Sequence, residues 1–447
     1  MSGWPRRSRT RSQGSAMTSD WRMQTVSELE AERVLLVQDG NHGEYRPRRE
    51  EIVPDGTPHI RAADISDAGV VDFDNAQRIN NAALSRIHKG VGARGDVVLT
   101  HKGTVGRIGR VPADAPHFVC SPQTTFWRSL DYDQLDQTFL FAYLRSPLFA
   151  AQLRTRMHET DMAPYVSLTA QRSLSVLMPP IGEQRRIASV LRALDHKIDS
   201  NQRLQARVMA VTEAELTRCL SRGGKVVSLC SAFKRGIGGI WGEDEASDVH
   251  STAARCLRGI DIHNLAEGNV ADAPSRYLKP AALEKRALTA GTVLVEGSGS
   301  FCGRSVMYIE PWSTLYEEPL VYSNFCKRLD PIVPIPLAAA AWMQLVFAYR
   351  TGEVAKYRTG SAFPNLDIDA LMTGLEITLP DLGAAVNWFA LLALALDPQS
   401  RRETALLAEI RDALLPKLIS GEIRVPETRD PDEVIGPAAE RLAAATP

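Results

Sequence analysis

The chain has 447 residues, of which 44% are hydrophobic and 6% aromatic, and its formal net charge is −1. This length predicts two or three domains, and the composition is sufficient for sizeable cores. A nucleic-acid-binding protein that works alone is usually basic overall. The near-neutral charge therefore excludes a uniformly basic binder, and any such role must use local basic patches or partners that supply positive surface.

The chain begins with a segment rich in Arg and Ser, residues 1–22, with four arginines between positions 6 and 11. The segment lacks the apolar stretch of a signal peptide. We expect a disordered basic tail, or a start codon assigned too early with Met17 or Met23 as the true start. A transit peptide is an alternative.

The cysteines and the apolar runs argue against metal and membrane. The six cysteines are scattered without the close spacing of a zinc site, so we expect reduced structural thiols in a cytosolic protein. The longest apolar runs, Leu337–Tyr349 and Trp388–Leu396, are shorter than the roughly 18 residues that a membrane span needs. We therefore expect no bound metal, no membrane segment and a cytoplasmic location.

The chain contains an internal repeat, which is decisive for architecture. Three stretches recur in the same order, with offsets of 197, 196 and 198: Ile60–Ile65 as Leu257–Ile262, Gly95–Thr100 as Gly291–Glu296, and Tyr165–Leu168 as Phe363–Leu366. After the second stretch, each copy has a turn that ends in Gly-Arg. Each copy then closes on an apolar run and a proline, at Val176–Pro180 and Leu375–Pro380. The matches indicate a duplication.

A long helix is predicted after each copy. In the first, Glu183–Leu220, a stripe at the spacing of helices that pack along a seam is formed by Ile187, Leu191, Leu194 and Ile198. Its length would be roughly 55 Å. The second begins near Ala384, is interrupted at Asp397 because a proline follows, and continues the seam with Leu407, Ile410 and Leu414. We expect Pro416 to kink its end and Gly421 to stop it.

The remaining segments alternate β-branched runs with Gly and Pro, and include predicted helices at Phe139–Met157 and Leu337–Arg350. The predicted fold class is α+β, with two similar globules at 23–180 and 223–380 that alternate with helices at 181–222 and 381–425. A loose tail is predicted at 426–447. On periodicity alone, the helices could also be ordinary core helices inside each globule.

Two motifs give the helices a more specific meaning. Pro179–Ile187 (PPIGEQRRI), followed by Leu194–Ile198 (LDHKI), resembles the first central helix of specificity subunits of type I restriction–modification enzymes, where Pro-Pro-x-x-Glu-Gln-x-x-Ile leads to Leu-Asp-x-x-Ile. Arg411–Ile423 (RDALLPKLISGEI) resembles the distal helix end of that family, and Gly95–Arg107 resembles the β-turn element of its target-recognition domains. The resemblance covers the chain from about Ser27 to Val425.

The resemblance implies a non-catalytic subunit with two target-recognition domains and two long helices that pair as an antiparallel coiled coil with pseudo-two-fold symmetry. It also implies the partners: double-stranded DNA, two methyltransferase subunits, and restriction subunits with translocase activity. S-adenosylmethionine, ATP and Mg would then be bound by those subunits and not by this chain. The chain departs from the family by one extra residue, Cys302, and by a second helix that starts without the Glu-Gln pair and carries Trp388.

Catalytic motifs are missing from the sequence. There is no P-loop. His158 and Glu159 are not followed by the second His of a zincin, and Gly297–Ser300 is not spaced as a nucleophile elbow. The pair at Pro179 lacks the flanking residues of an adenine-methylating site. We therefore predict no catalytic residues. The alternatives are a self-contained DNA methyltransferase or nuclease, and a helical scaffold that does not bind DNA.

Candidate DNA-contacting residues gather in loops of both copies. The window Lys89–Arg110 has five Lys or Arg against one acid, Asp96, and its glycines allow close approach to phosphates. Side chains of types that bind phosphates or base edges are Lys89, Arg94, Lys102, Thr104, Arg107, Gln123, Thr124 and Ser167 in the first copy, and Ser298, Ser300, Arg304, Arg358, Ser361 and Asn365 in the second. Because these loops differ, we expect a bipartite, asymmetric target whose spacing is set by helix length.

Overall fold

A computed structural model describes residues 21–40, 43–67, 69–157, 164–266, 271–309, 316–360 and 363–427. Its internal contacts divide the chain into two units. Unit 1 comprises Met1–His196 and Glu409–Pro447, and unit 2 comprises Lys197–Ala408. Each unit therefore contains one globule together with its own portions of the long helices.

The core of unit 1 is a four-stranded sheet with the strand order β2-β10-β7-β8. Its neighbouring strands are antiparallel, and they are β2 (Leu35–Asp39), β7 (Val97–Thr100), β8 (Ile108–Arg110) and β10 (Thr124–Ser129). All four residues of β7 are buried, as expected of an inner strand that reads Val-Val-Leu-Thr. The short helix α3 (Gln137–Leu144) packs on this sheet.

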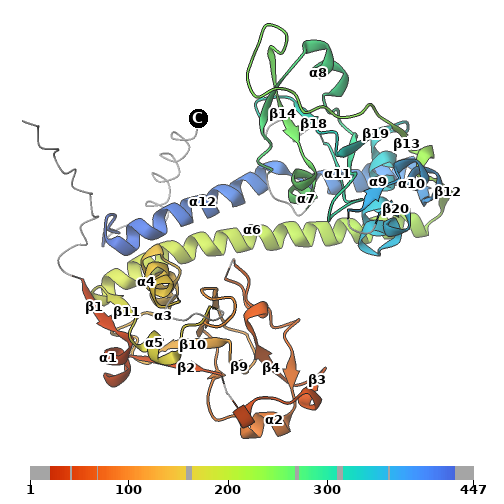
Figure 1. Ribbon diagram of the computed structural model, residues 1–447. Helices are drawn as coiled ribbons and strands as arrows, with labels where there is room; N and C mark the ends of the chain where they lie inside the picture. Colours follow the sequence, from red (N-terminus) through yellow and green to blue (C-terminus); the bar gives the residue numbers. More distant parts are fainter. Residues whose placement is uncertain are drawn as a thin grey trace, which may run out of the picture. The chain divides into compact units, whose positions relative to one another are not determined.

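Further elements of unit 1 surround this sheet (Figure 1). A second sheet has the order β3-β5-β4-β9-β6, in which β4 and β9 are parallel; its strands are β3 (Ile52–Val53), β4 (Thr57–Ile60), β5 (Arg78–Ile79), β6 (Val91–Gly92) and β9 (Phe118–Cys120). The first strand, β1 (Arg22–Thr25), pairs with β11 (Ser175–Met178). The short helices are α1 (Val26–Ala31), α2 (Asn81–Arg86) and α5 (Leu168–Arg172).

Two sequence-based boundaries in unit 1 are wrong. The predicted helix Phe139–Met157 is two helices, α3 and α4 (Pro147–Met157), because a proline disfavours the helical conformation of the residue before it, here Ser146. The predicted basic tail 1–22 overlaps the fold at its end, since Trp21 is buried and β1 starts at Arg22. Residues 1–20 of that tail lie outside the described residues, as do residues 428–447 of the predicted C-terminal tail.

Unit 2 contains a four-stranded sheet with the order β13-β19-β16-β17. These strands are β13 (Phe233–Arg235), β16 (Val293–Glu296), β17 (Ser305–Met307) and β19 (Cys326–Pro331). In chain order, the first, fourth, second and third strands lie side by side, as they do in unit 1. Helix α9 (Ile335–Arg350) packs against it through buried alanines and Trp342, and begins two residues before the predicted start.

The other strands of unit 2 form smaller sheets. They are β14 (Thr252–Leu257), β15 (Ser275–Leu278) and β18 (Leu320–Tyr322) in one sheet, β12 (Gly224–Ser228) with β22 (Glu376–Pro380), and β20 (Arg358–Thr359) with β21 (Asn365–Leu366). Strands β14 and β18 are parallel, like β4 and β9 in unit 1. The remaining helices are α7 (Gly259–Ala266), α8 (Pro280–Arg286) and α10 (Ile368–Gly374).

The long helices follow the predicted pattern closely. Helix α6 spans Ile181–Ser221, and two helices, α11 (Leu382–Ala395) and α12 (Pro398–Ser420), follow β22. The break before Pro398 confirms the predicted interruption. Pro416 lies inside α12, and the helix stops directly before Gly421, whose φ is 74°.

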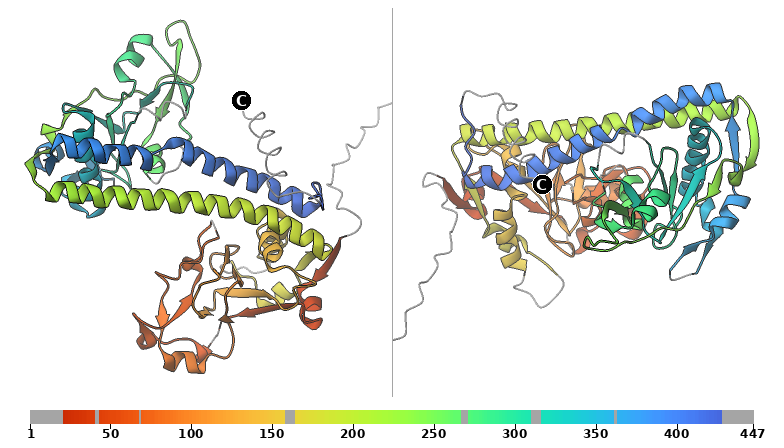
Figure 2. Two further views of the ribbon diagram at one scale, coloured as in Figure 1. Left: turned by 180° about the vertical axis from the view of Figure 1, so that it is seen from behind. Right: turned by 90° about the horizontal axis from the view of Figure 1, so that it is seen from above.

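Within each unit, the later helix lies beside α6 (Figures 1 and 2). In unit 1, the seam residues Ile187, Leu191, Leu194, Ile410 and Leu414 are buried, and Arg411 Nη1 lies 3.1 Å from Asp195 Oδ1. In unit 2, Ile198 is buried and Leu407 is half-buried. Three hydrogen bonds join α6 to the later helices in unit 2: Thr212 O accepts from Trp388 Nε1 at 2.7 Å, Ser400 Oγ accepts from Gln205 Nε2 at 3.0 Å, and Glu403 Oε2 accepts from Asn201 Nδ2 at 3.3 Å. Residue numbers fall along α6 as they rise along α11 and α12, so the helices are antiparallel within this unit.

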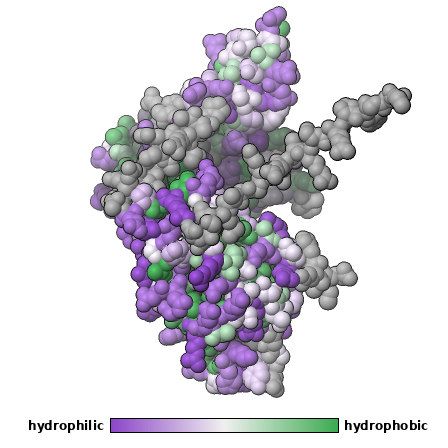
Figure 3. Space-filling view, turned by 90° about the vertical axis from the view of Figure 1, so that its left-hand side faces the viewer, coloured by the Kyte–Doolittle hydropathy of each residue, from purple (hydrophilic) through white to green (hydrophobic). Residues whose placement is uncertain are grey.

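The visible surface is mostly hydrophilic, with hydrophobic residues in small groups (Figure 3). Among the described residues, one stretch, Leu382–Ser420, is long and apolar enough by length and composition to cross a membrane. It is interrupted between α11 and α12, and a helix that packs in a protein core can be equally long and apolar. The six cysteines are free, and all except Cys230 are buried.

Candidate nucleic-acid interface

Both units carry the same hairpin turn after the inner strand of the main sheet. In unit 1, Thr100 N donates to Arg107 O and Gly106 N donates to Thr100 O, both at 2.9 Å. In unit 2, Glu296 N donates to Arg304 O and Gly303 N to Glu296 O, both at 2.8 Å. The turns therefore close in the same way although the second is one residue longer.

A second set of backbone bonds joins this turn to two other loops in each unit. In unit 1, His101 N donates to Gln123 O and His101 O accepts from Val166 N, both at 2.9 Å. In unit 2, Gly297 N donates to Phe325 O at 2.8 Å and Gly297 O accepts from Leu366 N at 2.9 Å. Gln123 and Phe325 are thus equivalent positions.

The equivalent pair Val166 and Leu366 corrects the third sequence match, which paired Tyr165 with Phe363. Lys102 forms an isolated antiparallel β-bridge with Tyr165 in unit 1, and Ser298 forms the same bridge with Asn365 in unit 2. Tyr165 is therefore equivalent to Asn365. The offset is 200 and not 198. The sequence match paired the aromatic residues Tyr165 and Phe363, but the register is set by the buried pair Val166 and Leu366. The exposed residues beside this pair differ between the units.

In unit 1, several predicted contact residues are exposed together with their loops: Lys89, Arg94, Lys102, Thr104 and Gln123. Lys102 Nζ lies 5.7 Å from the ring centroid of Tyr165. Arg94 Nε donates to Ala115 O at 2.9 Å, which leaves other guanidinium N–H groups for a ligand.

Three other predicted residues of unit 1 have structural roles. Thr124 is fully buried, and its hydroxyl donates to Ile60 O at 3.0 Å, so it is not accessible to DNA. Ser167 caps α5 by accepting from Ala170 N at 3.1 Å. Arg107 is half-buried and held by other groups, with Nε 2.7 Å from Asp67 Oδ1 and Nη1 3.2 Å from Ile65 O. The structural roles of these three residues cannot be predicted from residue type alone.

In unit 2, Ser300 and Asn365 are exposed, whereas Ser298 and Arg358 are half-buried; Ser361 lies outside the described residues. Arg304 lies in an aromatic cluster, with its guanidinium carbon 4.6 Å from the Phe301 ring centroid and 5.5 Å from that of Tyr349, and it bonds to His263 Nδ1. The His263 ring stacks on Phe301 with centroids 4.0 Å apart. Arg304 is therefore held from several sides.

Glu296 lies beneath this turn, at the position equivalent to Thr100. It is buried, and among the described residues its Oε2 has no hydrogen-bond partner. Burial raises the pKa of Glu296 to about 7, against the opposing effect of the Arg304 charge. The carboxyl group therefore changes protonation state near neutral pH.

Two exposed aromatic residues of unit 2 belong to the same surface. Phe325 is 68% exposed and Phe363 is 80% exposed. The repeated stretch Phe363–Leu366 includes Phe363 and Asn365, whereas no motif in the sequence singles out Phe325. Phe325 lies directly before β19, at the position equivalent to Gln123. Only the backbone hydrogen bonds reveal this equivalence.

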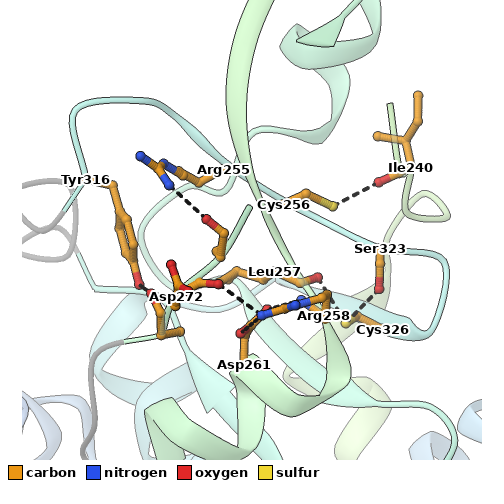
Figure 4. A network of polar contacts seen from close by, with 12 residues as sticks. Ile240, Arg255, Cys256, Leu257, Arg258, Asp261, Asp272, Tyr316, Ser323 and Cys326 are labelled. Atoms are coloured by element: carbon orange, nitrogen blue, oxygen red, sulfur yellow. Dashed lines mark hydrogen bonds and ion pairs between the residues drawn. The ribbon is translucent and has the colours of Figure 1, made fainter. Parts of the chain in front are cut away.

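Both units contain a matched ion pair at equivalent positions of the repeat. Asp64 Oδ2 accepts from Arg61 N at 2.8 Å and Nε at 3.0 Å. Asp261 Oδ2 accepts in the same way from Arg258 N at 2.7 Å and Nε at 2.8 Å. Figure 4 shows the unit 2 pair among neighbouring polar contacts. The hydrogen bond to each carboxylate raises the pKa of the arginine above its usual value, and among the described residues no group of His, Cys, Asp or Glu gathers as metal ligands would.

Comparisons with known proteins identify the fold. No family model and no curated protein sequence matches the chain. A type I restriction–modification S subunit from M. genitalium matches with a TM-score of 0.56 and 14% identity, over 91% of this chain and 97% of that one. Two further structures match at TM-score 0.36: the HsdS subunit from Thermoanaerobacter tengcongensis (18% identity, 91% of this chain, 98% of that one) and a chain from work on complex assembly and conformational transition of the type I R-M system (17%, 91% and 100%). The chain thus has the fold of a type I restriction–modification S subunit.

Proposed function

We propose that this chain is the DNA-recognition subunit of a type I restriction–modification complex. It is not itself an enzyme, and it positions methyltransferase and restriction subunits on DNA. The observation that carries this proposal is that two loop scaffolds with the same backbone bonds present different side chains. Lys102, Gln123 and Tyr165 in unit 1 stand where unit 2 has Ser298, Phe325 and Asn365.

Such a pair of surfaces would read two different short sequences. Side chains that bond base edges or touch base methyl groups supply sequence information, whereas Lys and Arg neutralise phosphates. The target is then bipartite and asymmetric. Among the predicted residues, we keep Lys89, Arg94, Lys102, Thr104 and Gln123 in unit 1, and Ser298, Ser300, Arg358 and Asn365 in unit 2, as DNA-contacting residues.

We further propose that the chain arose by duplication and has pseudo-two-fold symmetry. The same strand order in both main sheets supports this. The long helices would pair as an antiparallel coiled coil whose seam includes Ile187, Leu191, Leu194, Ile198, Leu407, Ile410 and Leu414. Helix length would then fix the gap between the half-sites, and two methyltransferase subunits could dock in equivalent ways.

The cofactors of such a complex belong to its other subunits. Methyl transfer uses S-adenosylmethionine, and translocation with cleavage uses ATP and Mg. This chain would contribute the DNA contacts and the docking surfaces, in the cytoplasm where DNA is accessible. A solitary helical scaffold would not account for the matched polar loops in both units.

The test is a genome-wide map of methylated bases in the source cells, with and without the gene. Loss of methylation at one bipartite motif is expected, and an unchanged map contradicts the proposal. Chains with Gln123→Ala or Asn365→Ala are then expected to relax different halves of that motif. If either substitution changes the base preference of both halves, the two-reader arrangement is wrong.

A further inference from the structure

Two exposed phenylalanines stand at the loop surface of unit 2. Burial of a phenylalanine side chain is ordinarily strongly favourable, yet Phe325 and Phe363 expose 68% and 80% of their surface. Both belong to loops that meet one short segment: Phe325 O accepts from Gly297 N at 2.8 Å, and Gly299 N donates to Pro364 O at 3.1 Å. Their backbones are therefore held in place while their rings stay accessible.

The surroundings favour nucleic acid as the molecule that covers these rings. Lys327 packs against the same segment, since a Cβ on Gly297 would lie 2.8 Å from Lys327 Cε. Arg358 belongs to the β20–β21 hairpin that carries Phe363, and its guanidinium carbon lies 5.6 Å from the ring centroid of Tyr349. Loops that combine exposed aromatic rings with lysine and arginine side chains suit DNA better than an apolar protein surface.

Asn365 supplies the polar part of this surface. Its amide has two N–H donors and one carbonyl acceptor. Nδ2 uses one donor on Phe363 O at 3.2 Å, which orients the amide and leaves the second donor and the carbonyl. That combination matches N7 and N6 of adenine in the major groove, and the methyl group of thymine is the apolar feature of the same base pair.

We propose that Phe325 and Phe363 are specificity-determining residues that contact thymine methyl groups in the half-site read by unit 2, and that Asn365 bonds an adenine of that half-site. This inference rests on the proposed function. Unit 1 has Gln123 and Tyr165 at the positions of Phe325 and Asn365, so the roles assigned to Phe325 and Asn365 are specific to unit 2.

The test uses the full chain in complex with its methyltransferase subunits and duplexes that carry the mapped target. Deoxyuridine replaces thymidine one position at a time, which removes the methyl group and keeps base pairing. At contacted positions in one half-site, affinity is expected to fall about fourfold, as for loss of one buried methyl-sized group. Phe325→Ala and Phe363→Ala are expected to remove this sensitivity, each at its own position.

The control variant is Ile332→Ala, at a 52% exposed side chain directly after β19 and at the opposite end of that strand from Phe325, and it is expected to keep the full deoxyuridine effect. Specific binding that is insensitive to deoxyuridine at every position, or equally sensitive in the Phe variants, overturns the inference and leaves the proposed function intact. Base unstacking at a position other than the methylated base, seen with 2-aminopurine fluorescence and lost in Phe325→Ala or Phe363→Ala, would indicate insertion between bases and also overturns it. No preference for the mapped target over unrelated DNA contradicts the proposed function itself.

Discussion

The ion pair between Arg258 and Asp261 offers a sharp test of how unit 2 is stabilised. The Asp261 side chain is fully buried, whereas that of Arg258 is 41% exposed. In Arg258→Ala, the carboxylate keeps its bond from the backbone N–H of residue 258 and loses the two guanidinium bonds. A buried charge without its partner costs about 3–5 kcal/mol, so we expect Arg258→Ala to lower the free energy of unfolding of unit 2 by about that amount.

Removal of the other partner is expected to cost less. In Asp261→Ala, the arginine remains charged but partly hydrated, and Nη2 still donates to Asp272 O at 2.9 Å. The loss is then the hydrogen bonds to a charged acceptor, about 1.5–3 kcal/mol. The double variant Arg258→Ala/Asp261→Ala is expected to be more stable than Arg258→Ala because it contains no stranded carboxylate.

The assay is urea unfolding combined with hydrogen exchange read peptide by peptide. Exchange in peptides of unit 2 should accelerate in Arg258→Ala while peptides of unit 1 stay unchanged. The matched variant Arg61→Ala should give the reverse pattern, since Asp64 is only 7% exposed. If the double variant is no more stable than Arg258→Ala, a stranded carboxylate is not the cause of the loss, and the reasoning is refuted.

The remaining predictions concern the seam, the spacing, salt and pH. Leu194→Asp places a charge at a side chain that is 1% exposed. Calorimetry should therefore show unfolding of unit 1 at a lower temperature, and DNA specificity should be lost. An unchanged unfolding temperature contradicts the role of Leu194 in the helix seam. Four residues inserted near Gln202 add about 6 Å of helix, and the methylation map should show the same half-sites with a gap one or two base pairs longer; a fixed gap means that the helices do not set the spacing. If about six phosphates are neutralised, log affinity should fall against log salt with a slope near −5, and a flat line excludes the basic loops. Because the pKa of Glu296 rises from 4.5 to about 7 on folding, stability is fully present below pH 4.5 and falls as pH rises to about 7. Glu296→Gln should remove this dependence in urea titrations and gain up to about 3 kcal/mol at pH 8, whereas Glu284→Gln on exposed α8 should not.

The sequence by itself determined the elements whose signal is local. The seam of α6 has a fixed spacing, the break before Pro398 comes from a proline, and the helix end at Gly421 comes from a residue that tolerates positive φ. The position of Gly106 and Gly303 in equivalent turns was also readable, since the turns need the same backbone shape. Such signals depend on neighbours in the chain and not on distant contacts.

Tertiary structure alone decided which polar side chains are available to a ligand. Thr124 and Gln123 are neighbours of similar polarity, yet one hydroxyl is buried against Ile60 O and the other side chain is exposed. Arg107 and Arg94 likewise differ in whether an acid from another loop holds the guanidinium. The equivalence of Phe325 with Gln123 follows from backbone bonds between loops far apart in sequence. Burial and partner choice are properties of the assembled surface, because the groups that cover or bind a side chain come from remote parts of the chain.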